Sequence, residues 1–287
     1  MIPGAFDYHR PQSVEEAVAL MSSLGDDVAL VAGGHSLIPM MRLRMAVPQN
    51  LVDLQDIEAL KVIAIEDGAI TLGAMVTQAE LIASEALAAA CPIIRETATE
   101  IADPQVRNLG TIGGNVANGD PGNDMPAVMQ ALDASYVLSG PEGSRECKAR
   151  GFYEAAFLTA RADGEILTAI RIPVPAAGHG YAYQKQKRKI GDYATAAAAV
   201  ILSVSGGSCS AAAIGLTNLA DTPLFAEDAS AALVGSSFDG AVIDAAVSAA
   251  VAITAPAEDG RGPAEFRRHL AGVMLRRAIE KAQARAS

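Results

Sequence analysis

The chain has 287 residues, which is enough for two or three domains with a sizeable core. Hydrophobic residues make up 51% of it, many of them alanine, while aromatic residues make up 4% and tryptophan is absent. The net charge of −11 argues against a nucleic-acid partner. No apolar run has the length of a membrane span, and residues 1–10 carry no basic segment followed by an apolar one. These features favour a cytoplasmic protein.

Cysteine and histidine residues are few and far apart. The three cysteines are Cys91, Cys147 and Cys209, and the chain has neither a C-x-x-C pair nor a histidine pair at metal-binding spacing. Isolated cysteines of this kind usually serve as small buried apolar side chains rather than as metal ligands or disulfide partners. We therefore expect this chain to hold neither a zinc ion nor an iron–sulfur cluster of its own.

Residues 1–55 predict a compact α/β unit. Ser13 and Glu16 form a capping box ahead of an apolar pattern with helical spacing, and Gly25 ends that helix. The elements expected after it are a strand over residues 28–31, a short helix over residues 37–45 and a strand over residues 51–54. Alternating helices and strands at this spacing indicate a first subdomain.

Residues 56–177 predict a second α/β subdomain. Thr77 and Glu80 form another capping box, Pro92 begins the next helix, and Pro126 suits the first position of a third. The elements expected here are a strand over residues 70–75, helices that end near residues 90, 102 and 132, a hairpin of residues 136–138 with 145–148, and a strand over residues 166–172.

Residues 178–287 predict a C-terminal α+β domain, because a segment rich in proline, alanine and glycine at residues 173–180 suits a domain boundary. Its expected elements are strands over residues 181–187, 197–204 and 210–216, then helices over residues 227–233 and 241–253 and from Pro263 onward. The alanines of residues 197–204 also suit a helix, so that alternative stays open.

Two stretches contain adjacent glycines, Ala32-Gly33-Gly34-His35-Ser36 and Thr111-Ile112-Gly113-Gly114-Asn115. Adjacent glycines allow positive φ and leave no Cβ, so successive backbone N–H groups can point at a bound anion. Two such nests suggest a diphosphate held between two chain segments, although both stretches can also be tight turns. The chain has neither the Gly-Lys pair of a Walker A loop nor a G-x-G-x-x-G fingerprint.

These stretches, with Asp124 and with Lys185 ahead of Gly191-Asp192-Tyr193-Ala194, resemble the FAD-binding subunits of molybdenum hydroxylases, a family that includes the flavin domain of xanthine dehydrogenase. The resemblance runs from Met1-Ile2-Pro3-Gly4-Ala5-Phe6 to Gly272-Val273-Met274-Leu275-Arg276-Arg277. It implies an α+β fold, in which two α/β subdomains form a PCMH-type FAD-binding fold and a C-terminal α+β domain contains a three-stranded antiparallel sheet. Within the family, residues 187–193 and 255–262 resemble the branch that oxidises carbon monoxide.

The resemblance also implies that FAD is bound non-covalently and that this chain supplies no catalytic residue and no metal ligand. The implied FAD-binding residues are Ala32, Gly33, Gly34, His35, Ser36, Leu37, Ile101, Ala102, Thr111, Gly113, Gly114, Asn115, Asp124, Leu167, Lys185 and Tyr193. Ser36, Thr111 and Asn115 suit hydrogen bonds to phosphate oxygens, but each can instead cap its own loop.

Three of these residues have two interpretations each. Asp124 would repel a diphosphate, so it either accepts hydrogen bonds from ribose or ribityl hydroxyls or caps the helix that begins at Pro126. Lys185 is either a cation near flavin N1 and C2=O, which would raise the reduction potential, or a solvated strand lysine. Tyr193 either covers one face of the isoalloxazine ring or is an ordinary core tyrosine.

The family implies two partner subunits, a large one that oxidises the substrate at a molybdenum cofactor and a small one with two [2Fe-2S] clusters that pass electrons to this FAD. We expect a dimer of heterotrimers, a quinone as electron acceptor, and a cytoplasmic location with peripheral association at the inner face of the membrane. One alternative is the flavin subunit of a hydroxylase for nicotine, quinoline, an aldehyde or a purine. Another is a non-catalytic module that binds phosphate or a nucleotide.

Overall fold

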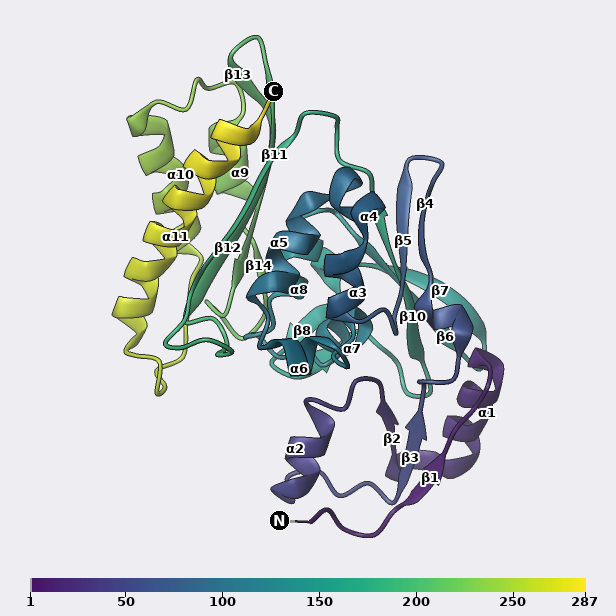
Figure 1. The fold of residues 1–287 in the computed structure, drawn as a ribbon. Helices are drawn as coiled ribbons and strands as arrows, with labels where there is room; N and C mark the ends of the chain where they lie inside the picture. Colours follow the sequence, from purple (N-terminus) through teal and green to yellow (C-terminus); the bar gives the residue numbers. More distant parts are fainter. Residues whose placement is uncertain (1) are drawn as a thin grey trace.

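A small parallel sheet begins the fold, in the computed structural model that describes residues 2–287. Its strands lie in the order β1 (Asp7–His9), β3 (Asn50–Asp53), β2 (Val28–Val31), with helix α1 (Val14–Leu24) packed beside them (Figure 1). Half of the expected capping box of α1 is present, since the Ser13 hydroxyl accepts from the Glu16 N–H group at 3.1 Å, while the Glu16 carboxylate accepts from the Gln12 N–H group at 2.7 Å instead of from Ser13. Helix α2 (Leu37–Arg42) ends earlier than expected, because Arg44 turns the chain with φ 62°.

The second unit is built on an antiparallel sheet. Its strands lie in the order β4 (Ile63–Glu66), β5 (Ala69–Gly73), β10 (Ile166–Pro173), β6 (Ser135–Gly140), β7 (Gly143–Lys148). The helices here are α3 (Gln78–Ala83), α4 (Glu85–Ala90), α5 (Pro92–Glu100), α6 (Pro104–Arg107), α7 (Ile112–Ala117) and α8 (Met125–Ala131), and the small hairpin consists of β8 (Tyr153–Ala155) and β9 (Leu158–Thr159).

Two expectations for this unit are corrected by the structure. The single helix expected after Thr77 is divided at Ser84, whose extended backbone ends α3. The Ser84 side chain then caps α4 by accepting from the Leu87 N–H group at 3.3 Å. The second glycine stretch is the first turn of α7 rather than a loop, because the Thr111 side chain caps this helix and fixes its start.

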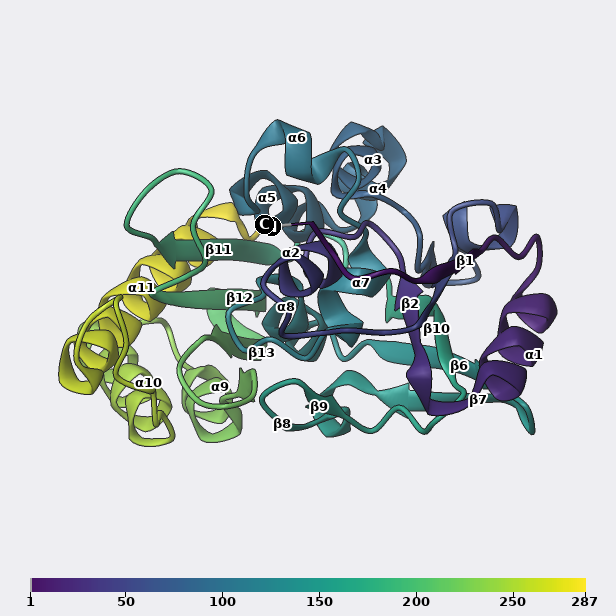
Figure 2. The same ribbon diagram turned by 90° about the horizontal axis from the view of Figure 1, so that it is seen from below.

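The C-terminal unit contains three long antiparallel strands, β11 (Gly180–Gln186), β12 (Ala196–Ser205) and β13 (Ser208–Thr217), with the two-residue β14 (Leu224–Phe225) at one edge. Helices α9 (Glu227–Leu233), α10 (Gly240–Ala252) and α11 (Ala264–Arg285) cover its outer face (Figures 1 and 2). Helices α5 and α8 pack against the opposite face, so the sheet lies between two helical layers.

The alanine run of β12 explains how helices approach both faces of this sheet. Ala196 and Ala198 face the core shared with α9, α10 and α11, whereas Ala197 and Ala199 face the core of the second unit. All four are fully buried, so strand pairing and packing override the helical propensity of alanine. On β13 a Cβ at Gly215 would lie 2.1 Å from the carbonyl oxygen of Ala127 in α8, and only glycine allows this approach.

The division of the chain at residues 55 and 177 remains our prediction. The three larger sheets span residues 7–53, 63–173 and 180–225. The apolar cluster around α1 also includes Ile57, Leu60, Met75 and Ile166, so the first two units share a core. Within residues 2–287, no helix is both long enough and apolar enough to cross a bilayer.

Candidate functional site

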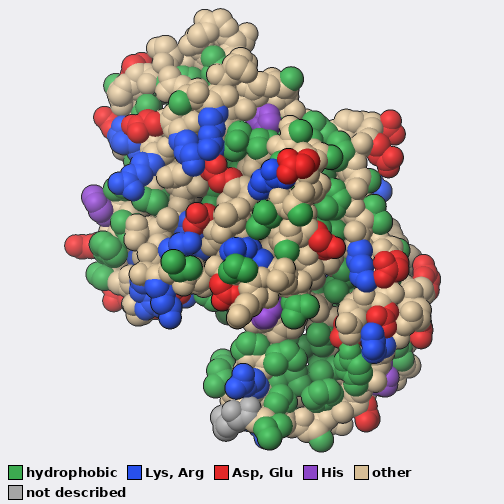
Figure 3. Space-filling view, viewed as in Figure 1, with side chains coloured by type: hydrophobic (Ala, Val, Ile, Leu, Met, Phe, Trp, Pro, Cys, Tyr) green, Lys and Arg blue, Asp and Glu red, His purple; other side chains and the backbone are tan. Residues whose placement is uncertain are grey.

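A cavity of about 710 Å³ lies where the N-terminal unit meets the rest of the molecule. Figure 3 shows apolar side chains gathered on the N-terminal unit, on the side that faces the rest of the molecule. The walls come from segments of all three units, among them β2 with the first glycine stretch, residues 74–78, residues 101–106, α7 with the loop before α8, strand β10, and the loop before β12. The volume is typical of a small-molecule or cofactor site, and such sites combine apolar walls with a few polar groups.

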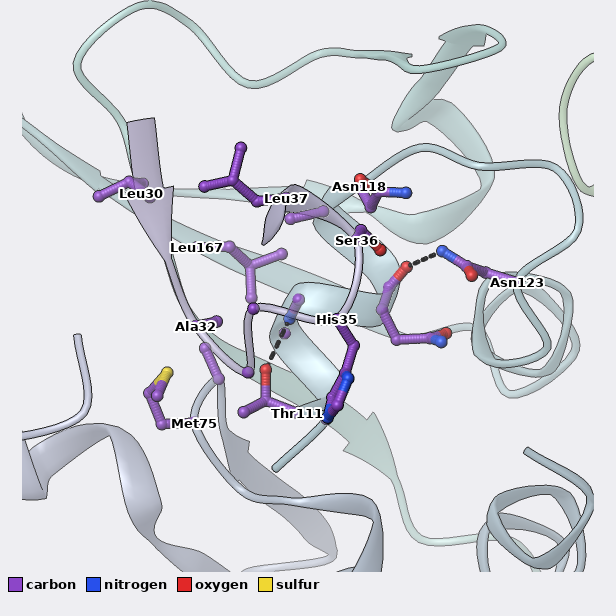
Figure 4. A pocket seen from close by; sticks show the side chains of 18 of the residues that line it. Leu30, Ala32, His35, Ser36, Leu37, Met75, Thr111, Asn118, Asn123 and Leu167 are labelled. Carbon is purple, nitrogen blue, oxygen red and sulfur yellow. Dashed lines mark hydrogen bonds between the residues drawn. The ribbon is translucent and has the colours of Figure 1, made fainter. Parts of the chain in front are cut away.

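The cavity brings together fifteen of the sixteen residues expected to bind FAD (Figure 4). They are Ala32, Gly33, Gly34, His35, Ser36, Leu37, Ile101, Ala102, Thr111, Gly113, Gly114, Asn115, Asp124, Leu167 and Tyr193. Lys185 is the exception, since it does not line the cavity. Segments separated by more than 150 residues in sequence therefore share one site.

The first glycine stretch presents free backbone donors. Gly34 has φ 72°, and the N–H groups of residues 33–36 have no acceptor among residues 2–287. Ser36 occupies the cap position of α2, but its hydroxyl makes no capping hydrogen bond, so the self-capping interpretation is wrong for this residue. Gly33 is needed for close approach, because a Cβ there would lie 2.1 Å from the Leu109 carbonyl oxygen. This stretch has the free donors of an anion nest.

The second glycine stretch does not form the expected nest. The N–H groups of residues 112–115 all donate within the chain at 2.9–3.0 Å, to the Val76 and Ala74 carbonyls and twice to Thr111. The glycines here serve packing, because a Cβ at Gly113 would lie 2.5 Å from Ala74. The expectation of two equivalent nests is therefore wrong, although this segment still lines the cavity.

Thr111 and Asn115 act as caps in this structure. The Thr111 hydroxyl accepts from the Gly114 N–H group at 3.0 Å (Figure 4). The Asn115 side-chain oxygen accepts from the Met125 N–H group at 3.3 Å, and its backbone carbonyl accepts from the Asn123 amide at 2.7 Å. The Thr111 side chain thus caps its own segment, whereas the Asn115 side chain binds the start of α8 rather than its own loop and so joins α7 to α8.

Asp124 lies on the cavity wall with both carboxylate oxygens already paired. One accepts from Lys185 Nζ at 2.8 Å and the other from the Tyr183 hydroxyl at 2.5 Å. It makes no hydrogen bond that caps α8. Burial raises the pKa of Asp124 above its usual range, and the charge and hydrogen bond of Lys185 oppose that shift.

Lys185 is neither a solvated strand lysine nor part of the cavity wall. Its side chain is 1% exposed, and besides Asp124 it donates to the Glu100 carbonyl at 3.2 Å. The cation expected beside the ligand therefore lies one layer behind the wall, paired with Asp124. The alternating pattern of β11 could not reveal this pairing, because it spans 61 residues of sequence.

Tyr193 lies at the cavity wall and is 40% exposed, so the core-tyrosine interpretation is wrong. It packs close to Gly122, where a Cβ would lie 2.9 Å from the tyrosine ring. The Arg261 guanidinium is 5.8 Å from the ring centre. Arg188 links the same two loops, since it pairs with Asp192 at 2.8 Å and donates to the Gly260 carbonyl at 2.9 Å.

Several cavity residues carry no signal in the sequence. Leu30 and Met75 add apolar surface, and Asn118 and Asn123 add amides (Figure 4). Gln78 also lines the cavity, although in sequence it is an ordinary residue inside a capping box. Only the tertiary contacts among the units place these side chains at one site.

Family models cover nearly the whole chain. The model described as "FAD binding domain in molybdopterin dehydrogenase" matches residues 4–175, and "CO dehydrogenase flavoprotein C-terminal domain" matches residues 181–282. The chain belongs to the FAD-binding subunits of the molybdopterin dehydrogenase family. The expected family and fold class are thus confirmed.

Individual relatives match over their full length. The carbon monoxide dehydrogenase medium chain of Afipia carboxidovorans is 63% identical over 286 residues, which is 100% of this chain and 99% of the relative. A reconstituted CO dehydrogenase structure from Oligotropha carboxidovorans matches with a TM-score of 0.99 and 63% identity, covering 100% of both chains. Quinoline 2-oxidoreductase from Pseudomonas putida 86 matches with a TM-score of 0.94 and 33% identity, covering 99% of both chains.

FAD is accordingly the cofactor of this oxidoreductase subunit, and the molybdenum cofactor and iron–sulfur clusters belong to other subunits. The residues present suit FAD. The unpaired N–H groups of residues 33–36 offer donors to an anion, and the apolar walls suit flat rings. Among residues 2–287, no group of three or more His, Cys, Asp or Glu side chains is placed to hold a metal ion.

Proposed function

We propose that this chain is the FAD-carrying electron-transfer subunit of a carbon monoxide dehydrogenase. The observation that carries the proposal is the cavity of about 710 Å³ whose wall holds the unpaired N–H groups of residues 33–36. The 63% identity to a carbon monoxide dehydrogenase medium chain over the full length supports the choice of substrate. Residues 187–193 and 255–262, which resemble the same branch, meet beside Tyr193 at this cavity.

The residues of the wall have distinct proposed roles toward FAD. The N–H groups of residues 33–36 and the Ser36 hydroxyl would donate to the diphosphate. Asp124 would accept from ribose or ribityl hydroxyls, because an anion is disfavoured next to phosphate. Tyr193 would lie beside the isoalloxazine ring. When bound, FAD supplies the ability to accept and release electrons, and this chain supplies binding, orientation and electrostatics.

The partner roles complete the proposed function. A large subunit oxidises carbon monoxide to carbon dioxide at molybdenum, and the [2Fe-2S] clusters of a small subunit pass the electrons to this FAD. The three cysteines of this chain are too few for the four ligands of one cluster, which supports this division. The final acceptor is a quinone, and the complex is a dimer of heterotrimers in the cytoplasm, associated peripherally with the inner face of the membrane.

Separating and recombining the subunits tests this proposal. The complete complex should contain FAD, and its flavin absorbance should bleach when carbon monoxide is added without oxygen. The isolated chain, loaded with FAD, should exchange electrons with dyes but should not bleach with carbon monoxide. Adding the small and large subunits should restore bleaching. Bleaching of the isolated chain would contradict the division of labour.

The same flavin role in another molybdenum hydroxylase is the second candidate. The likeness to a quinoline 2-oxidoreductase structure supports it, because a chain with the same fold, at a TM-score of 0.94 and 33% identity, belongs to an enzyme named for a different substrate. Assaying the complete complex with quinoline, nicotine, an aldehyde and a purine beside carbon monoxide separates the two. Turnover of one of these organic substrates, with none of carbon monoxide, would select the second candidate.

A further inference from the structure

Gln78 is a buried side chain whose hydrogen-bonding groups are both unused. It is 1% exposed, and neither its amide nitrogen nor its amide oxygen has a partner within residues 2–287. A buried amide without partners destabilises the folded chain, so nearly all such groups in proteins are paired. Of the buried side-chain atoms without partners in the part of the chain that the structure describes, only those of Gln78 belong to a cavity residue.

The backbone of Gln78 is held by hydrogen bonds, while no hydrogen bond holds its side-chain amide. Its N–H group donates to the Gly110 carbonyl at 2.9 Å, and the preceding Thr77 bridges to Thr111 at the start of α7. The residue therefore lies beside the segment that carries the second glycine stretch. Gln78 lines the cavity, and the terminal torsion of a glutamine side chain is broad, so rotation can turn its amide toward the cavity.

We propose that the Gln78 amide is an FAD-binding group, which turns into the cavity and pairs with a part of the cofactor that both donates and accepts hydrogen bonds. This rests on the proposed FAD site. A phosphate oxygen only accepts, so it would leave the amide oxygen unpaired. A sugar hydroxyl or the edge of a ring satisfies both groups, as in the bidentate pairing of glutamine with adenine.

This assignment predicts opposite effects on the free and the bound protein. Gln78→Met keeps an unbranched side chain of similar length and removes both polar atoms. The FAD-free protein should become more stable, because the unpaired groups are gone. FAD should bind about 10-fold more weakly, because the hydrogen bonds to the cofactor are lost. A purely structural glutamine would show a loss of stability instead.

The experiment compares thermal unfolding and cofactor affinity in the purified complex. FAD-free and FAD-loaded samples of wild type and Gln78→Met are unfolded, and dissociation constants for FAD, FMN and ADP are measured from flavin fluorescence and by calorimetry. Thr97→Val is the matched control, since the Thr97 hydroxyl is buried without a partner but is not on the cavity wall. This control should raise the unfolding temperature without changing FAD affinity.

The three ligands locate the partner of Gln78. Weaker binding of FAD and ADP, with FMN unchanged, assigns the amide to the adenosine half, and weaker binding of FAD and FMN assigns it to the flavin half. FAD affinity unchanged in Gln78→Met overturns the proposal, as does a lower stability of the FAD-free variant. Absence of FAD from the wild-type complex would instead contradict the proposed function itself.

Discussion

The Lys185 ammonium group lies 2.8 Å from a carboxylate oxygen of Asp124, and both side chains are almost fully buried, at 1% and 6% exposure. The pair joins β11 of the C-terminal unit to the start of α8 on the cavity wall. Tyr183, two residues before Lys185 on β11, holds the other oxygen of Asp124 at 2.5 Å. The C-terminal unit thus fixes a carboxylate of the proposed FAD site.

Breaking this pair from one side should destabilise the fold. Lys185→Met leaves a buried carboxylate without its cation, which costs about 3 kcal/mol of unfolding free energy. The double variant Asp124→Asn with Lys185→Met should recover most of the loss, because neither charge remains. Denaturant unfolding of wild type, both single variants and the double variant measures the coupling. Additive losses would show that the two residues do not interact.

The stability loss of Lys185→Met should depend on pH. Burial raises the pKa of Asp124 in the folded chain, and without Lys185 nothing of comparable strength opposes that shift. The folded state then binds more protons than the unfolded state between the two pKa values, so the unfolding free energy falls as pH rises through this window. The difference from wild type should be largest at neutral pH and should shrink as the solution is acidified. If the stability difference between Lys185→Met and wild type did not change with pH, the lost stability would not come from the charge of Asp124.

The reduction potential of the flavin should also respond to this pair. Lys185→Met leaves an uncompensated Asp124 beside the cofactor, and this charge disfavours the anionic reduced ring. We expect a potential roughly 30 mV lower than wild type, equal to ~1.4 kcal/mol for two electrons. Spectroelectrochemical titration of samples with equal FAD content measures it. The double variant with Asp124→Asn is the control and should lie near wild type.

Gly33→Ala should release FAD while the rest of the fold persists. The added Cβ would lie 2.1 Å from the Leu109 carbonyl oxygen, so the first glycine stretch must move away from the second unit and open the cavity. FAD affinity should fall by at least about 10-fold. Gly240→Ala is the matched control, since no atom lies within 4 Å of a Cβ there. Equal FAD content in both purified variants would show that this contact does not shape the site.

FMN should not replace FAD. The free N–H groups of residues 33–36 can hold phosphate, but FMN lacks the adenosine half that would fill the remaining cavity of about 710 Å³. We expect FMN to bind about 100-fold more weakly, by competition measured with flavin fluorescence. Affinities within a factor of three would indicate that the adenosine half makes little contact.

Local patterns in the sequence determined many of the helices and strands and most of the residues expected to line the cavity. The caps at Ser13 and Thr77, the glycine at the end of α1 and the helix over residues 227–233 depend on neighbouring residues, so the sequence predicts them. The first glycine stretch is partly of this kind, because glycine allows the positive φ of Gly34, but only the folded surroundings leave its N–H groups without acceptors.

Only the tertiary structure decided how distant groups share hydrogen bonds and space. The N–H groups of the second glycine stretch are taken up in part by Ala74 and Val76, and Lys185 is paired with a carboxylate 61 residues away. The unused amide of Gln78 is visible only once its surroundings are known. A side chain has the same local pattern whether its partner is water, protein or a ligand. The partner is fixed by long-range packing, which buries the group and decides what remains within reach.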